Sequence, residues 1–357
     1  MRYLILGGTG PMGTHLCDLL CDEDAEISVT SRVHRDDYDS IKYIEGDARD
    51  VDFLYPLLRS KWDVIVDFMV YENSEFEDRV SALLAATCHY IYLSSARVYD
   101  NSQRCITEEC TRLLDTSSDK DFVSSNEYAI SKARQEDVLK SMPLKNWTVI
   151  RPYITYGEER LQLGTLEKES WLYRGLKGRT IVFSDDIKNR VTTLTYGLDI
   201  ARAMVKIIGN QKAFGEAYHI TSQHCFKWSE ILEVYLEVIE EATGQRPSIL
   251  FQKLSDFMVW NPGKYAIQYD RMYDRKFDNS KINSLVLIDT FINPRDGLRK
   301  CLKSFLKSPV YKSISWRREA IKDDYCKEAT PLSEIPTMRS KLIYLSFRYI
   351  PWLRDKI

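Results

Sequence analysis

The sequence predicts an α/β protein with a doubly wound parallel sheet, followed by a smaller mixed subdomain. Two observations lead to this fold class. Over the first 150 residues, short β-type runs alternate with stretches whose apolar residues recur at helical spacing, and this alternation is typical of a parallel sheet covered by helices. The first run ends in a cluster of glycines that leads into a helical stretch, which is a common strand–turn–helix unit in such sheets.

Six short runs in this region are predicted as strands of the sheet. A covering helix is expected over 74–87, because Phe76, Val80 and Leu83 fall on one helical face. In chain order, the predicted strands are 3–6, 27–30, 41–44, 64–68, 90–94 and 148–150.

The alternation is lost after Pro152, and the pattern over 161–181 is irregular. Helices are expected over 197–208 and 228–243, with a strand at 217–220 between them. The length of 357 residues suffices for two domains. We expect a dinucleotide-binding domain over 1–155 with a returning segment near 190–222, a discontinuous substrate-binding subdomain over 156–308, and a basic, aromatic C-terminal extension over 309–357.

The composition excludes a membrane-spanning protein, because hydrophobic residues make up 44% of the chain without an apolar run of about 18 residues. The first six residues run directly into glycines and do not form the apolar stretch of a secretory signal, so we expect a cytoplasmic protein. Eight cysteines form no CxxC pair and no Cys/His cluster. They are expected to be reduced thiols, and no metal site is predicted.

The glycine cluster is the first candidate binding motif. It places Gly7, Gly10 and Gly13 between the first predicted strand and a helix. Glycines allow a tight turn and a close approach of the backbone to a pyrophosphate, and the helix start supplies N–H groups to the anion. A glycine turn can also be purely structural, but its position favours dinucleotide binding. The cofactor-binding residues expected in this turn are Gly7, Thr9, Gly10, Pro11, Met12 and Gly13.

The end of the second predicted strand bears on the choice of cofactor. Ser31 and Arg32 stand where an NAD-binding fold commonly has an acid for the ribose 2′-hydroxyl, and the first acid is Asp36. An arginine can instead bind a 2′-phosphate, so either NAD or NADP is expected, and Arg32 favours NADP. The alternative is a solvated basic loop. Asp47, after the third strand, could accept from an adenine amino group or could only form a turn.

A serine, a tyrosine and a lysine form the candidate catalytic group. Ser95 lies at a strand end, and Tyr128 follows 33 residues later with Lys132 one helical turn beyond it. A tyrosine with a pKa near 10 is a poor base at neutral pH, but a nearby ammonium favours its phenolate. Ser95 would position a hydroxyl or carbonyl for hydride transfer. A lone YxxxK is common on surface helices, but here it follows the serine strand and the glycine turn.

With these motifs in order, the sequence resembles the extended short-chain dehydrogenase/reductases, specifically the NAD-dependent epimerase/dehydratase family that acts on nucleotide sugars. The resemblance covers about residues 1–300 and implies a Rossmann-type sheet. The motifs that carry it are GGTGPMG at 7–13, GDARD at 46–50, VDFMV at 66–70, SSARVY at 94–99, YAISK at 128–132, RPYITYG at 151–157, YGLDIARAM at 196–204 and DNSK at 278–281.

The resemblance also implies roles for individual residues. Ser95, Tyr128 and Lys132 take the catalytic serine, tyrosine and lysine roles, and Tyr128 and Lys132 also contact the cofactor. The further cofactor-binding residues are Asp47 and Ala48 by the adenine, Phe68, Met69 and Val70 along the cofactor, and Ser31, Arg32, Ser94 and Pro152.

Departures from the family pattern affect the expected reaction. In the 4,6-dehydratases of the family an Asp-Glu pair follows the catalytic hydroxyl, whereas Ala96 and Arg97 follow Ser95 here, so dehydration is disfavoured. Ile154 stands where sugar epimerases often have an asparagine that contacts the substrate. Candidate substrate-binding residues are Arg97, Arg190 and Arg271, with Arg275 as another possibility.

The C-terminal extension is basic, since residues 299–357 carry 14 Lys and Arg against 6 Asp and Glu. Aromatic and apolar residues alternate with basic ones over 339–356, which would suit contact with an anionic membrane surface. A helix packed on the body or on a partner subunit is the favoured interpretation, because amphipathic helices usually serve a core. Nucleic-acid binding is not expected, because no recognisable module accompanies these charges.

The leading hypothesis is a nucleotide-sugar epimerase that acts at C4 by transient hydride transfer to a nicotinamide cofactor, with Tyr128 as acid and base. An NADPH-dependent nucleotide-sugar 4-ketoreductase is the first alternative, because Arg32 favours NADP. A non-catalytic NAD(P)-binding regulatory or RNA-binding relative is the second. The protein is expected to be a homodimer.

Overall fold

The computed structural model describes residues 1–21, 25–350 and 352–353 of the chain. These residues form two compact units, and each unit is described by itself. The first unit contains residues 1–157, 193–225 and 275–294, and the second contains 158–192, 226–274 and 295–357. The described residues from 309 onward are thus part of the second unit. Among the described residues, no helix combines the length and the apolarity that crossing a membrane requires.

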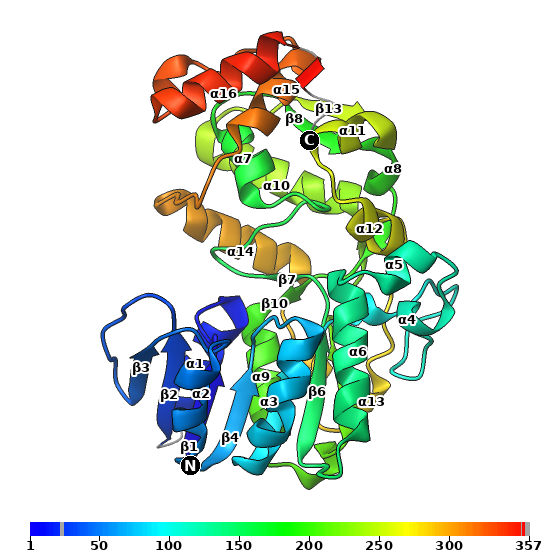
Figure 1. Cartoon of the computed structure of the whole chain (residues 1–357). Coiled ribbons are helices and arrows are strands. Elements are labelled where there is room, and N and C mark those ends of the chain that lie inside the picture. Colours follow the sequence, from blue (N-terminus) through cyan, green and yellow to red (C-terminus); the bar gives the residue numbers. More distant parts are fainter. Residues whose placement is uncertain (22–24, 351, 354–357) are drawn as a thin grey trace. The chain divides into compact units, whose positions relative to one another are not determined.

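A seven-stranded sheet forms the centre of the first unit (Figure 1), and neighbouring strands in it are parallel. The strand order is β11-β6-β5-β4-β1-β2-β3, so the chain reverses direction across the sheet between β1 and β4. The predicted α/β fold with a doubly wound parallel sheet is confirmed. The strands are β1 (Arg2–Leu6), β2 (Glu26–Ser31), β3 (Ile41–Glu45), β4 (Trp62–Asp67), β5 (Thr87–Leu93), β6 (Trp147–Pro152) and β11 (Glu216–Ile220).

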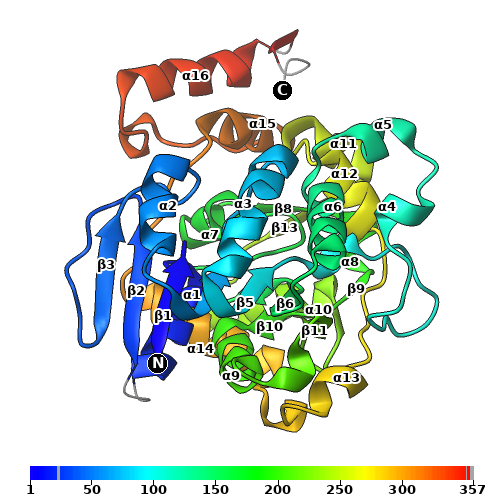
Figure 2. The same cartoon turned by 60° about the horizontal axis from the view of Figure 1, so that its bottom comes forward.

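Helices cover both faces of this sheet, as Figures 1 and 2 show. On β1, Tyr3 and Ile5 pack into one apolar cluster with helices α1 and α9, whereas Leu4 and Leu6 pack into the other cluster with α2, α3 and α6. Because successive side chains of a strand point to opposite faces, a strand covered on both sides must be apolar throughout. This explains why the predicted strands read as continuous apolar runs.

The helices of the first unit position its loops at the carboxyl ends of the strands. Helix α3 ends at Ala85, two residues before the predicted end, because Thr87 already belongs to β5. The remaining elements of this unit are α1 (Pro11–Cys21), α2 (Val51–Leu58), α3 (Asn73–Ala85), η1 (Ala96–Val98), α4 (Leu113–Thr116), α5 (Lys120–Ser124), α6 (Tyr128–Ser141), β7 (Thr155–Tyr156), β10 (Thr195–Tyr196), α9 (Gly197–Ile207), η2 (Gln211–Ala213), α13 (Ser280–Asn283) and η4 (Ile288–Thr290).

The second unit is mostly helical, with short strand pairs β8–β13 and β9–β12. Its elements are α7 (Lys168–Leu176), β8 (Ile181–Ser184), α8 (Asp185–Lys188), β9 (Val191–Thr192), β12 (Phe226–Lys227), α10 (Trp228–Thr243), β13 (Ile249–Gln252), α11 (Leu254–Trp260), α12 (Lys264–Ala266), η3 (Ile267–Arg271), α14 (Pro294–Lys307, within this unit from Arg295), α15 (Trp316–Cys326), η5 (Leu332–Glu334) and α16 (Met338–Tyr349).

Helix α7 lies in the stretch whose pattern is irregular in the sequence. Its buried face includes Arg174, whose guanidinium donates to Glu319 at 2.9 Å, Asp323 at 2.7 Å and Glu328 at 2.8 Å. A buried charge is tolerated only where such partners surround it. Apolar periodicity does not reveal this helix in the sequence, because part of its core-facing side is charged.

Candidate active site

A cavity of about 280 Å³ lies at the carboxyl ends of the central strands of the first unit. Such an edge, at the point where the strand order reverses, is where doubly wound sheets bind ligands. The backbone N–H of Gly7 donates to Thr30 Oγ1 at 3.0 Å and so joins two of the loops that line it. The predicted residues that line the cavity are Gly7, Thr9, Ser31, Arg32, Ala48, Phe68, Met69 and Val70, and the sequence missed Thr30, Gly46 and Arg49.

The glycine turn fits the phosphates of a dinucleotide. Gly7 has a φ of +72°, and a Cβ at Gly13 would lie 2.5 Å from the carbonyl oxygen of Gly8. Both positions therefore require glycine, the second because helix α1 crosses close to the turn. Pro11 opens α1, so the first N–H groups of this helix are available to an anion. Gly10, Pro11, Met12 and Gly13 build this helix start and do not line the cavity itself.

Two arginines line the cavity at the end of β2 and after β3. Arg32 is the predicted one and Arg49 the missed one, and the lining residues that the structure describes include no carboxylate. Asp47 does not line the cavity, because its side chain accepts from the Arg49 backbone N–H at 3.0 Å and pairs with the Arg49 guanidinium at 3.3 Å. The backbone hydrogen bond from Arg49 lowers the pKa of Asp47. This end of the cavity is thus suited to a phosphate.

Helix α6 begins at Tyr128, and Lys132 follows one turn later with its side chain buried. The Lys132 ammonium donates to the carbonyl oxygens of Met69 at 3.2 Å and Leu93 at 2.7 Å, and to the phenol oxygen of Tyr92 at 3.0 Å. Since Met69 lines the cavity, Lys132 reaches the cavity wall from the helix. The end of β5 and the loop after β4 meet at this one ammonium.

Ser95 and Tyr128 are linked through Arg97. The Ser95 hydroxyl oxygen accepts from the Arg97 backbone N–H at 3.2 Å, and this bond caps the short helix η1. The Arg97 guanidinium lies 5.4 Å from the centre of the Tyr128 ring and pairs with Glu127 at 2.5 Å. Arg97, predicted as a substrate-binding residue, therefore places a positive charge beside the phenol ring, where it would stabilise negative charge.

Burial lowers the pKa of Lys132 to about 8, although the nearby carboxyl groups of Asp67 and Glu136 oppose this shift. We expect turnover that depends on the Lys132 ammonium to fall as the pH rises through about 8. Unfolding does not explain such a loss, because the unfolded chain keeps the Lys132 proton up to about pH 10.4 and this residue's contribution to stability rises above pH 8.

The measurement is kcat/KM against pH, with a parallel thermal melt at each pH. Lys132→Arg keeps a charge that does not titrate in this range, so its residual activity should show no fall near pH 8. A fall of the same midpoint in Lys132→Arg would assign the titration to another group.

Two buried carboxyl groups, missed in the sequence, hold this site together. Asp67 ends β4 and accepts from Tyr90 at 2.6 Å, Tyr71 at 3.0 Å and the Met69 N–H at 2.9 Å. It thus fixes the loop that lines the cavity, and its burial raises its pKa. In the sequence, only the position of Asp67 near the end of a predicted strand, next to Phe68, could have indicated its role in the site.

The second buried carboxyl group belongs to Glu136, one turn after Lys132 on α6. It accepts from the Ser94 hydroxyl at 2.5 Å and from the Arg151 guanidinium at 2.6 and 2.9 Å. Burial raises the pKa of Glu136, but the Arg151 ion pair outweighs it and the net shift is downward. Ser94 therefore faces this buried pair, and neither it nor Pro152 lines the cavity.

Ile154, where the family resemblance leads one to expect asparagine, has a φ of +30°. A β-branched residue rarely adopts positive φ, whereas asparagine does so more easily. The backbone shape that suits asparagine is therefore retained here, although isoleucine cannot hydrogen-bond a substrate.

The two other predicted substrate residues, Arg190 and Arg271, belong to the second unit. The Arg271 guanidinium donates to the Gly164 carbonyl at 3.0 Å and pairs with Asp270, so its charge is partly used within that unit. Both assignments remain predictions.

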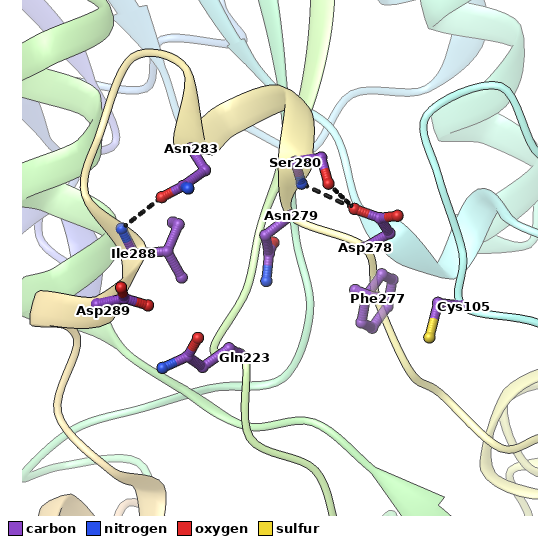
Figure 3. Close-up of a pocket in the computed structure, with 9 residues that line it drawn as sticks. All are labelled: Cys105, Gln223, Phe277, Asp278, Asn279, Ser280, Asn283, Ile288 and Asp289. Carbon is purple, nitrogen blue, oxygen red and sulfur yellow. Dashed lines mark hydrogen bonds between the residues drawn. The ribbon is translucent and has the colours of Figure 1, made fainter.

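A second cavity of the first unit, about 340 Å³, lies beside α13 and is shown in Figure 3. Its lining includes Asp278, Asn279 and Gln223. Asp278 accepts from the Ser280 N–H at 2.9 Å, and the lining of this cavity includes none of the predicted cofactor and catalytic residues. The cavity at the glycine turn is therefore the candidate cofactor site.

Comparison with known proteins supports this choice. The model of the family described as "NAD dependent epimerase/dehydratase family" matches residues 3–221, which include both the glycine turn and α6. The chain is 28% identical to "Chloroplast stem-loop binding protein of 41 kDa b" of Arabidopsis thaliana over 238 residues, which are 62% of this chain and 59% of that protein. It is also 28% identical to a UDP-glucose 4-epimerase of Streptococcus mutans over 187 residues, 50% of this chain and 49% of that enzyme.

The chain thus spans about half to three fifths of the length of these two relatives. Among solved structures, the UDP-glucuronic acid 4-epimerase of Bacillus cereus, in complex with UDP-glucuronic acid and NAD, superposes with a TM-score of 0.62. It is 18% identical, and the match covers 86% of this chain and 99% of that one. At this identity the likeness shows the fold.

Proposed function

Because the chain belongs to the NAD dependent epimerase/dehydratase family, we propose that it is a nucleotide-sugar epimerase that acts at C4 with a bound nicotinamide dinucleotide. The observation that carries this proposal is the hydrogen bond from Lys132 to the Met69 carbonyl at 3.2 Å. It joins the helix that bears Tyr128 to the wall of the cavity beside the glycine turn. The names of the Streptococcus mutans and Bacillus cereus relatives support the same reaction class.

The residues that would hold the dinucleotide line the cavity or, at the start of α1, lie next to its glycine turn. The glycine turn and the start of α1 would bind its phosphates, and Ser31 and Arg32 would bind its adenosine ribose. Residues Phe68–Val70 would contact the rest of the dinucleotide. When bound, the nicotinamide supplies the acceptor and the donor of a hydride.

The protein's own part is to orient the sugar and move one proton. The Ser95 hydroxyl would hydrogen-bond the 4-hydroxyl of the sugar, and the Tyr128 oxygen would take its proton as C4 becomes a carbonyl. Lys132 and Arg97 would stabilise the negative charge on the phenol. The 4-keto sugar would then rotate to present its other face. Tyr128 would return the proton as the hydride returns to C4, so that the configuration at C4 is inverted without net oxidation.

The direct test is to incubate the purified chain with UDP-glucose or UDP-galactose, and with dTDP-, GDP- and CDP-sugars, without added reductant. We expect one pair of C4 epimers to reach the same equilibrium ratio from both directions. Consumption of one NADPH per product would instead identify a 4-ketoreductase. Failure of every sugar, together with no nucleotide released on denaturation, would contradict both enzymes.

The 4-ketoreductase remains the second candidate because Arg32 and Arg49 both line the cofactor cavity. The Arg32 guanidinium would bind a 2′-phosphate at the ribose end, whereas the Arg49 guanidinium is paired with Asp47.

We expect Arg32→Ala to weaken NADP binding at least tenfold, because a charge-assisted hydrogen bond to a phosphate is lost. NAD lacks that phosphate, so its affinity should change by less than about threefold. Titration calorimetry with both dinucleotides checks this, and Arg59→Ala, an exposed arginine after α2, is the matched control. Equal weakening of both dinucleotides would place Arg32 elsewhere on the cofactor.

A non-catalytic role is favoured by one observation, the match to a stem-loop binding protein of Arabidopsis thaliana. If this chain served as an RNA-binding protein, its function would not need the Tyr128 hydroxyl. The Tyr128→Phe variant treated in the Discussion separates the two roles.

A further inference from the structure

Helix α16 presents a row of apolar side chains to solvent. Met338, Leu342 and Tyr349 are 71%, 59% and 71% exposed, and Trp352 just after the helix is 61% exposed. Positions spaced by four and seven residues lie on one face of a helix. Contiguous exposed apolar patches that are rimmed by polar side chains mark interaction surfaces.

The opposite face of α16 is anchored, so this row is held outward. Tyr344 is buried, and its phenol donates to Asp323 on α15 at 2.6 Å. Arg348 pairs with Asp324 at 2.9 Å. Figure 1 shows α16 beside α15 in the second unit. The favoured expectation of a helix packed on the body accounts for this anchored face, while the side chains of the outer row are exposed.

The charged residues of α16 and its flanking segments are all positive. Residues 335–353 contain Arg339, Lys341 and Arg348 and no Asp or Glu. On α15, Glu319 and Asp323 pair with Arg174, and Asp324 pairs with Arg348. The positive charge of the outer face therefore comes from Arg339 and Lys341. The outer face therefore combines apolar side chains with cations and ends in Tyr349 and Trp352, whose rings suit a boundary between apolar and wet surroundings.

We propose that the outer face of α16, made of Met338, Leu342, Tyr349 and Arg339, docks on an anionic lipid membrane surface together with the exposed Trp352 that follows the helix. Such a surface would bury the apolar row and would attract the positive charge beside it. A second copy would bring like charges together, and RNA would leave the apolar row exposed. The contact is peripheral and reversible, because one short helix buries few apolar side chains. This inference concerns a surface apart from the cofactor cavity and does not rest on the proposed reaction.

The test is co-sedimentation of the full chain with vesicles of phosphatidylcholine alone or with about 30% phosphatidylserine. We expect binding to the phosphatidylserine vesicles that weakens with salt, and at least tenfold weaker partitioning of Leu342→Glu. Trp352→Ala and the double variant Arg339→Glu, Lys341→Glu should each reduce it several-fold. Leu287→Glu is the matched control, because Leu287 is a leucine of the first unit with 70% exposure, and its binding should equal that of the wild type.

Because Leu342 is exposed, its variant should melt within about 2 °C of the wild type; if it misfolds, the Trp352 and charge variants carry the test. Equal binding to both vesicle types, no binding to either, or unchanged binding of the variants would overturn the proposal. So would a dimer, measured by light scattering, that Leu342→Glu dissociates, or retention of RNA that this variant abolishes. Those two results would identify a second copy or a nucleic acid as the occupant.

Discussion

Tyr128→Phe should lower kcat for the epimerisation by about a thousandfold and leave the fold and dinucleotide binding unchanged. A general acid and base contributes roughly 10² to 10⁴ in rate, and this variant removes only the phenol oxygen. The ring stays, so the contact with the Arg97 guanidinium, 5.4 Å from the ring centre, is kept. The lining of the cavity does not include Tyr128. The measurement pairs initial rates with calorimetric titration of NAD and NADP.

Tyr55→Phe is the matched control. Its phenol, on the surface of α2, donates to the Asp78 carbonyl at 3.2 Å, and its removal should change neither rate nor binding. If Tyr128→Phe turns over nucleotide sugars at the wild-type rate, Tyr128 is not the acid and base. If the wild type turns over none of them yet binds RNA, and Tyr128→Phe binds it equally well, the non-catalytic role is the correct one.

Much of the fold could be predicted because the sheet is buried on both faces. Each of the six predicted strands is present, and the predicted strand at 217–220 becomes β11 beside β6. Continuous apolar runs, broken by turns and helical stretches, leave few other arrangements. The glycine turn could also be predicted, because both glycines are required by the structure. A side chain is disfavoured at Gly7 by its positive φ and excluded at Gly13 by contact with the backbone.

The supporting polar groups could not be predicted, because their partners lie far away in the chain. Asp67 is fixed by the phenol of Tyr90, and Arg174 by carboxylates 145 and 149 residues later. Such pairs are too far apart in the chain to form a local sequence pattern. The sequence also does not distinguish a buried charged residue from an exposed one. Arg49 was missed for a related reason, since only the loop shape turns it, and not Asp47, toward the cavity.

Removing the carboxylate of Glu136 should destabilise the first unit more than any surface change. Glu136 is fully buried and is the counter-charge of the buried Arg151, with contacts of 2.6 and 2.9 Å. Glu136→Leu would leave this guanidinium without its carboxylate, which costs about 3 to 5 kcal/mol. Chemical denaturation should show a lower free energy of unfolding by this amount. Glu240→Ala, in the exposed pair with Arg246 at 3.1 Å, should cost less than about 0.5 kcal/mol.

The double variant Glu136→Leu, Arg151→Met tests whether the ion pair itself stabilises the fold. The alternative is that the loss in Glu136→Leu comes only from leaving the Arg151 charge buried without a partner. Apolar replacements of a buried ion pair are often neutral or better, so the double variant should be more stable than Glu136→Leu alone. The two losses would then be far from additive. Additive losses would mean that the two residues act separately. The double variant still lacks the acceptor that fixes the Ser94 hydroxyl at 2.5 Å, next to Ser95. Its stability should therefore recover while kcat stays low, which separates the positioning role of Glu136 from its effect on folding.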